Sequence, residues 1–188
     1  MDACDQLKKL SPFLDPHLFL YLLQKNIGPE SQSLQDQIRS KMQVSDEAKS
    51  AELEKAAEEK AQKLLTLLSD RERVADLRKD SKFNFETLSK PDNGDITIED
   101  CTNLFDFAKV QYDLQKYQKA ENLLFNLKEI LISQTKDHYH LVSQVFWGLL
   151  ACMIILDKPR ESTELSTIRK LKDMLKSRYA ESPMGMLH

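Results

Sequence analysis

The segment PDNGDITIED, at residues 91–100, is the part of the chain that most resembles a metal-binding loop. An EF-hand calcium loop has a glycine at its sixth position, oxygen ligands at several odd positions before and after it, and a bidentate glutamate at its last position. With Gly94 as that glycine, Ser89 and Pro91 fall on the first and third positions, and Asp100 replaces the glutamate. Too few oxygen ligands remain for a good site. We therefore expect a capped loop, and a calcium-responsive helical protein is the less favoured functional alternative.

The histidines offer no metal or catalytic pattern. His138 and His140 are two residues apart, so on a helix they face different sides, and His17 and His188 are isolated. The sequence also contains no glycine-rich phosphate loop and no Gly-x-Ser-x-Gly element. We predict a protein that is not an enzyme, with no catalytic, metal-binding or cofactor-binding residue and no cofactor. Its binding residues cannot be assigned from the sequence.

Composition favours a helix-rich intracellular chain. The net charge is −3, 41% of the residues are hydrophobic, and glycine is rare. The three cysteines, Cys4, Cys101 and Cys152, are odd in number and far apart, which is typical of reduced thiols. The longest apolar stretch, at 145–156, is too short to span a membrane, and the N-terminus has no signal-peptide pattern. We expect a protein of the cytoplasm, with the nucleus as an additional location, and no membrane partner.

Basic residues gather near the end of the chain, with a surplus of three over the acidic ones. Such a helix could touch a phosphate backbone, or it could be an ordinary solvated face. A weak RNA contact is therefore one alternative. The basic residues are Lys158, Arg160, Arg169, Lys170, Lys172, Lys176 and Arg178, and the acidic ones are Asp157, Glu161, Glu164 and Asp173.

The first third of the chain predicts helices. Asp15 can cap a helix that has Pro16 at its first position and ends in the turn at 26–30. A second helix has one apolar stripe, and a charged helix from Ser45 to about Leu68 has a narrow one, typical of a helix packed on one side. On the charged helix, Lys55, Glu59 and Lys63 have the spacing of surface ion pairs. The two stripes are Leu34, Ile38 and Met42, and Leu53, Ala57, Ala61, Leu64 and Leu68.

The last half of the chain predicts four more helices, at about 98–114, 117–133, 138–156 and 162–179. Thr97 and Asp100 have the spacing of a capping box at the start of the first. The last has a predicted apolar stripe at Leu165, Ile168, Lys172 (by its stem), Leu175 and Tyr179. No segment alternates like a strand, so the fold class is all-α. We divide the chain into N-terminal helices (1–44), a charged long helix or spacer (45–82), a connecting segment and loop (83–97) and a helical-repeat region (98–188).

The segment FAKVQYDLQKYQKAENLLFNL joins two of these helices by a tight turn. Ala108 and Tyr112 share a face of the first helix, and Tyr117, Ala120 and Leu124 share a face of the second. Small alanines allow close approach, and the tyrosines can fill the space beside the turn. The next pair begins about forty residues later, which is typical of a stack of helix pairs.

Three elements carry a family resemblance. They are Phe-Leu-Asp-x-His-Leu (Phe13, Leu14, Asp15, His17, Leu18), Ala-Lys-x-Gln-Tyr (Ala108, Lys109, Gln111, Tyr112) and Trp-Gly-x-Leu-Ala (Trp147, Gly148, Leu150, Ala151). The helix pair resembles a tetratricopeptide unit, with Gln115 where such units usually have glycine. Together the elements resemble the N-terminal half of the e subunit of eukaryotic translation initiation factor 3. The segment 43–82 departs from that family in being shorter and more charged.

The resemblance implies a right-handed stack of helix pairs followed, in the family, by a PCI domain with a winged helix. It implies a scaffold subunit whose partners are the other subunits of the factor and the small ribosomal subunit with its associated factors. The chain stops at His188, before any winged helix, and we interpret it as a fragment of a divergent member. The alternative is the helical arm of a proteasome-lid or COP9-signalosome subunit. Stacked pairs predict that Trp147 and Tyr112 are buried between successive helices.

Overall fold

The structure is a computed structural model that describes residues 15–26, 32–42, 47–134, 136–157, 166–173 and 176. Every regular element within these ranges is a helix, which confirms the all-α prediction for the described residues. The chain divides into two units, residues 1–52 and 53–188. Phe13, Leu14, Cys4 and His188 lie outside the described residues, as do Lys158, Arg160, Leu165, Leu175 and Tyr179.

The first unit is built on a pair of helices, α2 (Pro16–Asn26) and α3 (Gln32–Met42). The predicted cap is confirmed, because the Oδ1 atom of Asp15 accepts hydrogen bonds from the backbone N–H groups of His17 (3.0 Å) and Leu18 (3.1 Å). The predicted stripe of α3 is confirmed as well. Its members pack into one small apolar cluster, made of Phe19, Leu23 and Ile38 with Leu20, Leu34 and Met42 around them.

The charged segment contains two helices, α4 (Glu47–Ser69) and α5 (Arg71–Lys79). Asp70 separates them and caps the second, since its side chain accepts a hydrogen bond of 3.0 Å from the N–H of Arg73. Most of the predicted stripe of α4 faces the core of the second unit, with Ala61 and Leu64 buried and Ala57 and Leu68 half-buried.

Two predictions for α4 are wrong. Leu53 is 59% exposed. The next residue, Glu54, contacts Lys116, which lies past the C-terminal end of α7, so α4 has already reached the end of α7 at this point. Leu53 therefore lies beyond the helix that covers the rest of the stripe. Lys63, predicted to pair with Glu59, pairs with Asp100 at 3.0 Å. A long-range partner replaces the local one.

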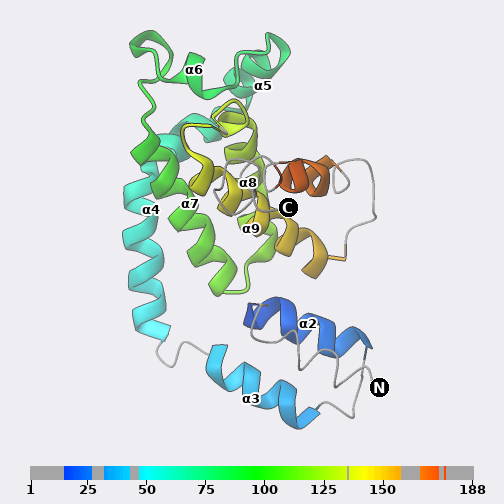
Figure 1. Cartoon of the computed structure of the whole chain (residues 1–188). Coiled ribbons are helices and arrows are strands. Elements are labelled where there is room, and N and C mark those ends of the chain that lie inside the picture. Colours follow the sequence, from blue (N-terminus) through cyan, green and yellow to red (C-terminus); the bar gives the residue numbers. More distant parts are fainter. Residues whose placement is uncertain are drawn as a thin grey trace. The chain divides into compact units, whose positions relative to one another are not determined.

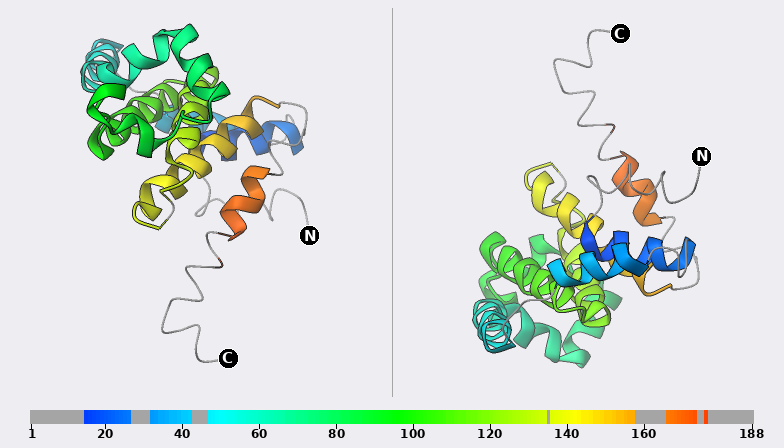
Figure 2. Two further views of the ribbon diagram at one scale, coloured as in Figure 1. Left: turned by 90° about the horizontal axis from the view of Figure 1, so that it is seen from above. Right: turned by 90° about the horizontal axis from the view of Figure 1, so that it is seen from below.

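Three helices form the body of the second unit: α7 (Ile98–Asp113), α8 (Tyr117–Leu131) and α9 (Tyr139–Ile155). They begin and end within two residues of the predicted bounds. A tight turn makes α7 and α8 an antiparallel pair, and α9 packs mainly against α8 (Figure 1). From Leu53 onward, α4 lies beside α7 at one edge of this unit, as two directions of view show (Figures 1 and 2).

The predicted packing of the α7–α8 pair is confirmed. Ala108 and Ala120 are fully buried, so the two helices approach closely at these positions. Tyr112 and Tyr117 are half-buried beside the turn, with ring centroids 5.4 Å apart in an edge-to-face arrangement. Such a geometry is favourable for aromatic pairs.

Short elements connect α5 to α7. They are α6 (Phe85–Leu88) and the 3-10 turn η3 (Pro91–Asn93), and Gly94 follows with φ of 135°, a conformation that favours glycine. Arg78 attaches α5 to α8, because its guanidinium donates hydrogen bonds to Glu129 (2.7 and 3.0 Å) and to Asn126 (2.7 Å).

Helix α7 ends in a Schellman motif without a glycine. The N–H of Gln115 donates to the carbonyl of Tyr112 (2.9 Å), and the N–H of Lys116 donates to the carbonyl of Gln111 (2.8 Å). Gln115 has φ of +61°, the left-handed conformation in which a side chain is unfavourable. The position where tetratricopeptide-like units have glycine therefore keeps the conformation that glycine prefers.

Replacing Gln115 with glycine is expected to raise the free energy of unfolding by up to about 1 kcal/mol. The gain comes from relief at a positive φ, and it is reduced by the larger entropy of glycine in the unfolded chain. Urea unfolding followed by circular dichroism would measure it. The matched control is Gln118→Gly inside α8, which should be destabilising, and equal effects at both positions would contradict the assignment.

Candidate assembly surface on helix α9

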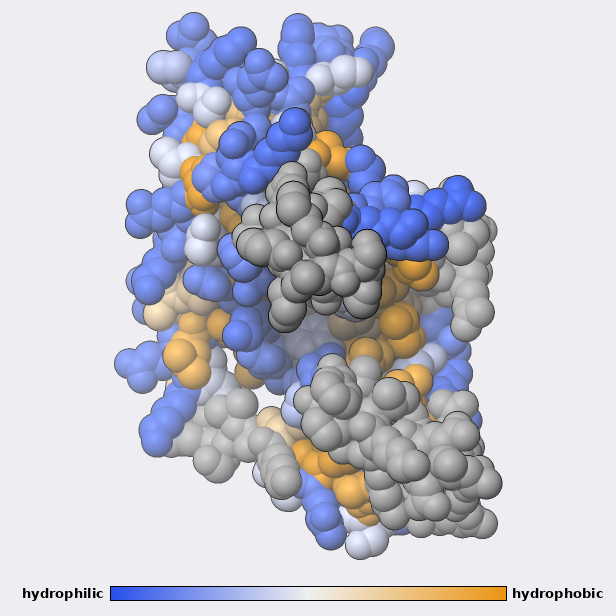
Figure 3. Space-filling model, viewed as in Figure 1, coloured by the Kyte–Doolittle hydropathy of each residue, from blue (hydrophilic) through white to orange (hydrophobic). Residues whose placement is uncertain are grey.

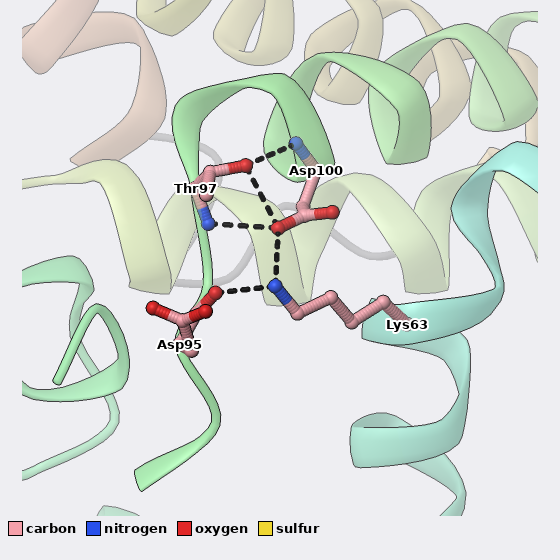
Figure 4. Close-up of polar contacts among 4 residues, drawn as sticks. All are labelled: Lys63, Asp95, Thr97 and Asp100. Atoms are coloured by element: carbon pink, nitrogen blue, oxygen red, sulfur yellow. Dashed lines mark hydrogen bonds and ion pairs between the residues drawn. The ribbon is translucent and has the colours of Figure 1, made fainter. Parts of the chain in front are cut away.

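The loop that resembled a calcium site is a helix cap. Thr97 and Asp100 form the predicted capping box: the Asp100 carboxylate accepts from the N–H of Thr97 (2.8 Å), and the Thr97 hydroxyl oxygen accepts from the N–H of Asp100 (3.2 Å). Lys63 from α4 donates to the same carboxylate and to the backbone carbonyl of Asp95 (Figure 4). The residue that would have to be the bidentate calcium ligand is thus engaged by the protein itself.

The electrostatics of Asp100 agree with this role. Burial alone would raise its pKa, but hydrogen bonds from Thr97 and the ammonium group of Lys63 outweigh burial and hold the pKa below the usual value. Among the described residues, no group of histidine, cysteine and acidic side chains has the arrangement of a metal site. His138 and His140 lie at the start of α9, where Tyr139 separates them.

Two cysteines lie in the core. Cys101 and Cys152 are both buried and form no disulfide among the described residues, and burial raises the pKa of the Cys101 thiol to about 12. A thiol that stays protonated at neutral pH is a poor nucleophile. We therefore assign Cys101 to packing, and Cys152 is buried in the same apolar cluster.

A polar cluster that sequence reasoning missed joins α4 to the α7–α8 turn. The carboxylate of Glu54 accepts two hydrogen bonds of 2.7 Å from Lys116 and one of 3.1 Å from the side chain of Gln111, and Lys119 lies 3.8 Å away. Gln111 is fully buried, and its Oε1 atom has no hydrogen-bond partner among the residues that the structure describes. The partners are more than fifty residues apart in sequence, so no local spacing could reveal them.

The hydrogen bond from Lys116, helped by Gln111 and by the nearby lysine charges, holds the pKa of Glu54 below its usual value. A lowered pKa means that the ionised carboxylate favours the folded state. Its contribution is fully present above the ordinary glutamate pKa of about 4.3 and is lost as the pH falls through the lowered value.

Replacing Glu54 with glutamine is expected to cost about 1 kcal/mol at pH 7, because both lysine partners are exposed and water screens the pairs. The difference from the parent protein should shrink as the pH falls below about 4. Urea unfolding at several pH values measures both effects. The control is Glu58→Gln, one turn further along the exposed side of α4, and a difference that stays constant with pH would contradict the predicted linkage.

Two open grooves, with volumes of about 460 and 330 Å³, both have Asp70 and Arg73 in their linings. Their linings mix acidic and basic side chains, and the guanidinium of Arg73 donates to the carbonyl of Asn93 at 3.0 Å. A lining of mixed sign defines no ligand chemistry, so we assign neither groove a site.

Helix α9 carries the most distinctive exposed apolar surface of the described residues. Seven of its residues face the core, and none of its residues is acidic or is a lysine or arginine. Trp147, predicted to be buried, is 52% exposed, so that prediction is wrong, whereas Tyr112, for which burial was also predicted, is half-buried. Ala151 and Ile154, four and seven residues further on, are half-buried and share the helix face of Trp147.

The rotation of α9 explains the exposed tryptophan. Gly148, the next residue, faces α8 so closely that a Cβ atom there would lie 3.1 Å from Cδ1 of Leu124. Phe146, the preceding residue, is buried. With these neighbours directed at the core, Trp147 points away from it. Figure 3 shows hydrophobic side chains over the C-terminal part of α9, whereas hydrophilic ones predominate along α4.

We call the face of Trp147, Ala151 and Ile154 the α9 face. Large aromatic residues dominate the energetics of many interfaces, so the half-exposed tryptophan makes this face the candidate contact surface. The fold and this face define the class of the protein: an all-α stack of helix pairs with a half-exposed apolar face on α9.

Comparison with known proteins shows which families and proteins this chain is similar to. Residues 31–111 match the family model described as the eIF3 subunit 6 N terminal domain. The chain is 27% identical over 210 residues to the e subunit of eukaryotic translation initiation factor 3 from Emericella nidulans, covering 98% of this chain and 45% of the relative. The same subunit from Neurospora crassa is 28% identical over 216 residues, covering 97% and 46%. No solved structure matches.

These findings confirm the resemblance: the chain is related to the e subunit of eukaryotic translation initiation factor 3. It spans less than half of the length of these relatives. Among the described residues, no helix is both long and apolar enough to cross a membrane.

Proposed function

We propose that the chain acts as a non-catalytic scaffold subunit of eukaryotic translation initiation factor 3 and contributes to assembly of the initiation complex on the small ribosomal subunit. Relatives named as the e subunit of that factor align with nearly the whole chain, and this similarity is the main support. A protein with this role would work in the cytoplasm and would need no cofactor.

The α9 face supports a role in assembly. Stacked helix pairs bury one another's apolar sides, and the pair α7–α8 is covered in this way by α9. The outer side of α9, with Trp147 half-exposed, has no such cover among the described residues. Other subunits of the factor are the partners that we propose for the chain, and the α9 face is the surface that we propose they contact.

The alternative is the helical arm of a related complex, the proteasome lid or the COP9 signalosome. The fold alone is compatible with either complex, because a stack of helix pairs serves many assemblies. The relatives described above all have the initiation-factor name, which favours the first proposal. The calcium-responsive alternative loses its main ligand, since the Asp100 carboxylate is bound by Thr97 and Lys63.

Affinity purification of the tagged full-length protein tests the proposal. We expect mass spectrometry to recover other subunits of the initiation factor together with proteins of the small ribosomal subunit. Recovery of proteasome-lid or signalosome subunits in their place would contradict it.

Two variants test the α9 face in the same experiment. Trp147→Ala is expected to reduce recovery of the partner subunits at least tenfold, because truncating a central interface tryptophan commonly costs about 2 kcal/mol or more. The matched control is Leu53→Ala. It removes an exposed apolar side chain from a different helix, α4, and should leave recovery unchanged. Equal losses for both variants, or no loss for either, would contradict the assignment of the α9 face.

A further inference from the structure

The helical segment at residues 166–173 has one face fixed in the core and the other lined with cations. Thr167 is 1% exposed and Leu171 is 4% exposed, and Leu171 belongs to the same apolar cluster as the buried residues of α9. The predicted apolar stripe through Ile168 and Lys172 is wrong, because these side chains are exposed. The buried side chains, Thr167 and Leu171, each come one residue before the predicted ones, so the basic residues face solvent.

The exposed cations are Arg169, Lys170 and Lys172, with Lys176 exposed and helical three residues beyond the segment. On a helix with 3.6 residues per turn, Arg169 and Lys172 lie on the side opposite Thr167 and Leu171. We call these four exposed cations the basic face; Arg169, Lys172 and Lys176 share one side of the helix, and Lys170, two residues from Lys172, lies at its edge. Asp173 is the acidic residue among the described positions of this segment.

Asp173, four residues after Arg169, lies on the same side of the helix and offsets one of the four charges, which leaves a surplus of three among the described residues of the segment. Helix α9, whose core residues share a cluster with Leu171, has no acidic residue. The anchoring of Leu171 also holds the backbone of residues 166–173 in a helix, so binding an anion does not require ordering a loose tail. Less conformational entropy is then lost on binding than with a flexible basic segment.

We propose that the basic face binds the phosphate backbone of single-stranded RNA. Arg169 and Lys172, three residues apart, share one side of the helix and lie within about 5 Å along its axis, a spacing that suits neighbouring phosphates. The planar guanidinium of Arg169 can bind a phosphate through two hydrogen bonds, and lysines act as point charges. The inference rests on the proposed function only for the choice of RNA as the ligand, since a translation factor functions in the presence of RNA. Binding itself can be measured on the purified chain alone.

The expected binding is weak and independent of base sequence, because no aromatic side chain among the described residues of this segment offers a stacking platform. Four phosphate contacts on a single strand predict a slope of log K against log salt of about −3. The net charge of −3 of the whole chain opposes long-range attraction, so the contact is local.

Fluorescence anisotropy with a labelled oligouridylate and the full chain tests the proposal at salt concentrations between about 0.05 and 0.2 M. The variant Arg169→Gln, Lys170→Gln, Lys172→Gln is expected to bind at least tenfold more weakly and to reduce the slope to about −1. The matched control is Lys55→Gln, Lys60→Gln, Lys109→Gln, which makes the same change in net charge at exposed positions of α4 and α7. Circular dichroism confirms that each variant is folded.

Two results would overturn the proposal. Equal losses in the target and control variants would mean that bulk charge, and not the basic face, attracts RNA. Binding of polyglutamate as tight as that of the oligouridylate would mean that the face recognises an acidic protein. Neither result depends on which complex the protein joins. The RNA-binding proposal can therefore fail while the affinity purification supports the proposed function, and the proposed function can fail while RNA binding is observed.

Discussion

Replacing Phe146 with alanine is expected to lower the free energy of unfolding of residues 53–188 by about 3–5 kcal/mol. Phe146 is 1% exposed and lies within the apolar cluster that α7, α8 and α9 share. Truncation removes its transfer free energy and leaves a cavity that close-packed neighbours fill only partly. Urea unfolding followed by circular dichroism, with the slope compared between variants, measures the loss.

The adjacent residue supplies the control. Trp147→Ala removes a larger side chain, yet it should cost no more than about 1 kcal/mol, because half of the tryptophan is already in water. The orientation of α9 thus predicts a large loss of stability for one of two adjacent residues and a small loss for the other. A greater loss of stability for Trp147→Ala than for Phe146→Ala would show that α9 is rotated differently and that the α9 face does not exist.

The sequence predicted features that local chemistry determines. Asp15 before Pro16, and Thr97 three residues before Asp100, mark helix starts because each side chain caps its own first turn. The close packing at Ala108 and Ala120 also followed from helical spacing. Such signals depend on residues within one or two turns, which explains why the bounds of α7, α8 and α9 were predicted within two residues.

The face that α9 turns to the core could not be predicted. The helix is apolar on nearly every side, so periodicity gives no preferred direction, and a tryptophan seemed best placed inside. In the structure, Trp147 is directed outward. Gly148 has no side chain, so α9 can approach Leu124 of α8 with this residue facing it, and the adjacent Trp147 then points away from the core.

Long-range polar contacts were also beyond prediction. Glu54 meets Gln111 and Lys116 across 57 and 62 residues, and Lys63 finds Asp100 across 37. On sequence alone, a charged helix offers each side chain local partners at four residues, and Glu59 was the reasonable choice for Lys63. Only the position of α4 beside α7 makes the distant partners available.

Replacing Gly148 with valine is expected to destabilise residues 53–188 by about 2–3 kcal/mol. A Cβ atom at this position already lies 3.1 Å from Cδ1 of Leu124, and the two further methyl groups of valine would have to displace α8 or α9. Gly148→Ala should be close to neutral, because the gain in helix propensity of about 1 kcal/mol offsets a small movement of the leucine. Urea unfolding compares the two variants.

A double-mutant cycle identifies Leu124 as the cause. Leu124→Ala alone should cost about 2–5 kcal/mol, since the side chain is buried, but it opens space for a larger residue at position 148. The combination with Gly148→Val should therefore be less destabilising than the two changes added together, by at least about 1 kcal/mol. Simple additivity would mean that the contact does not set the approach of the two helices. A rescued double variant that again binds the other subunits of the factor would show that the contact between Gly148 and Leu124 orients the α9 face.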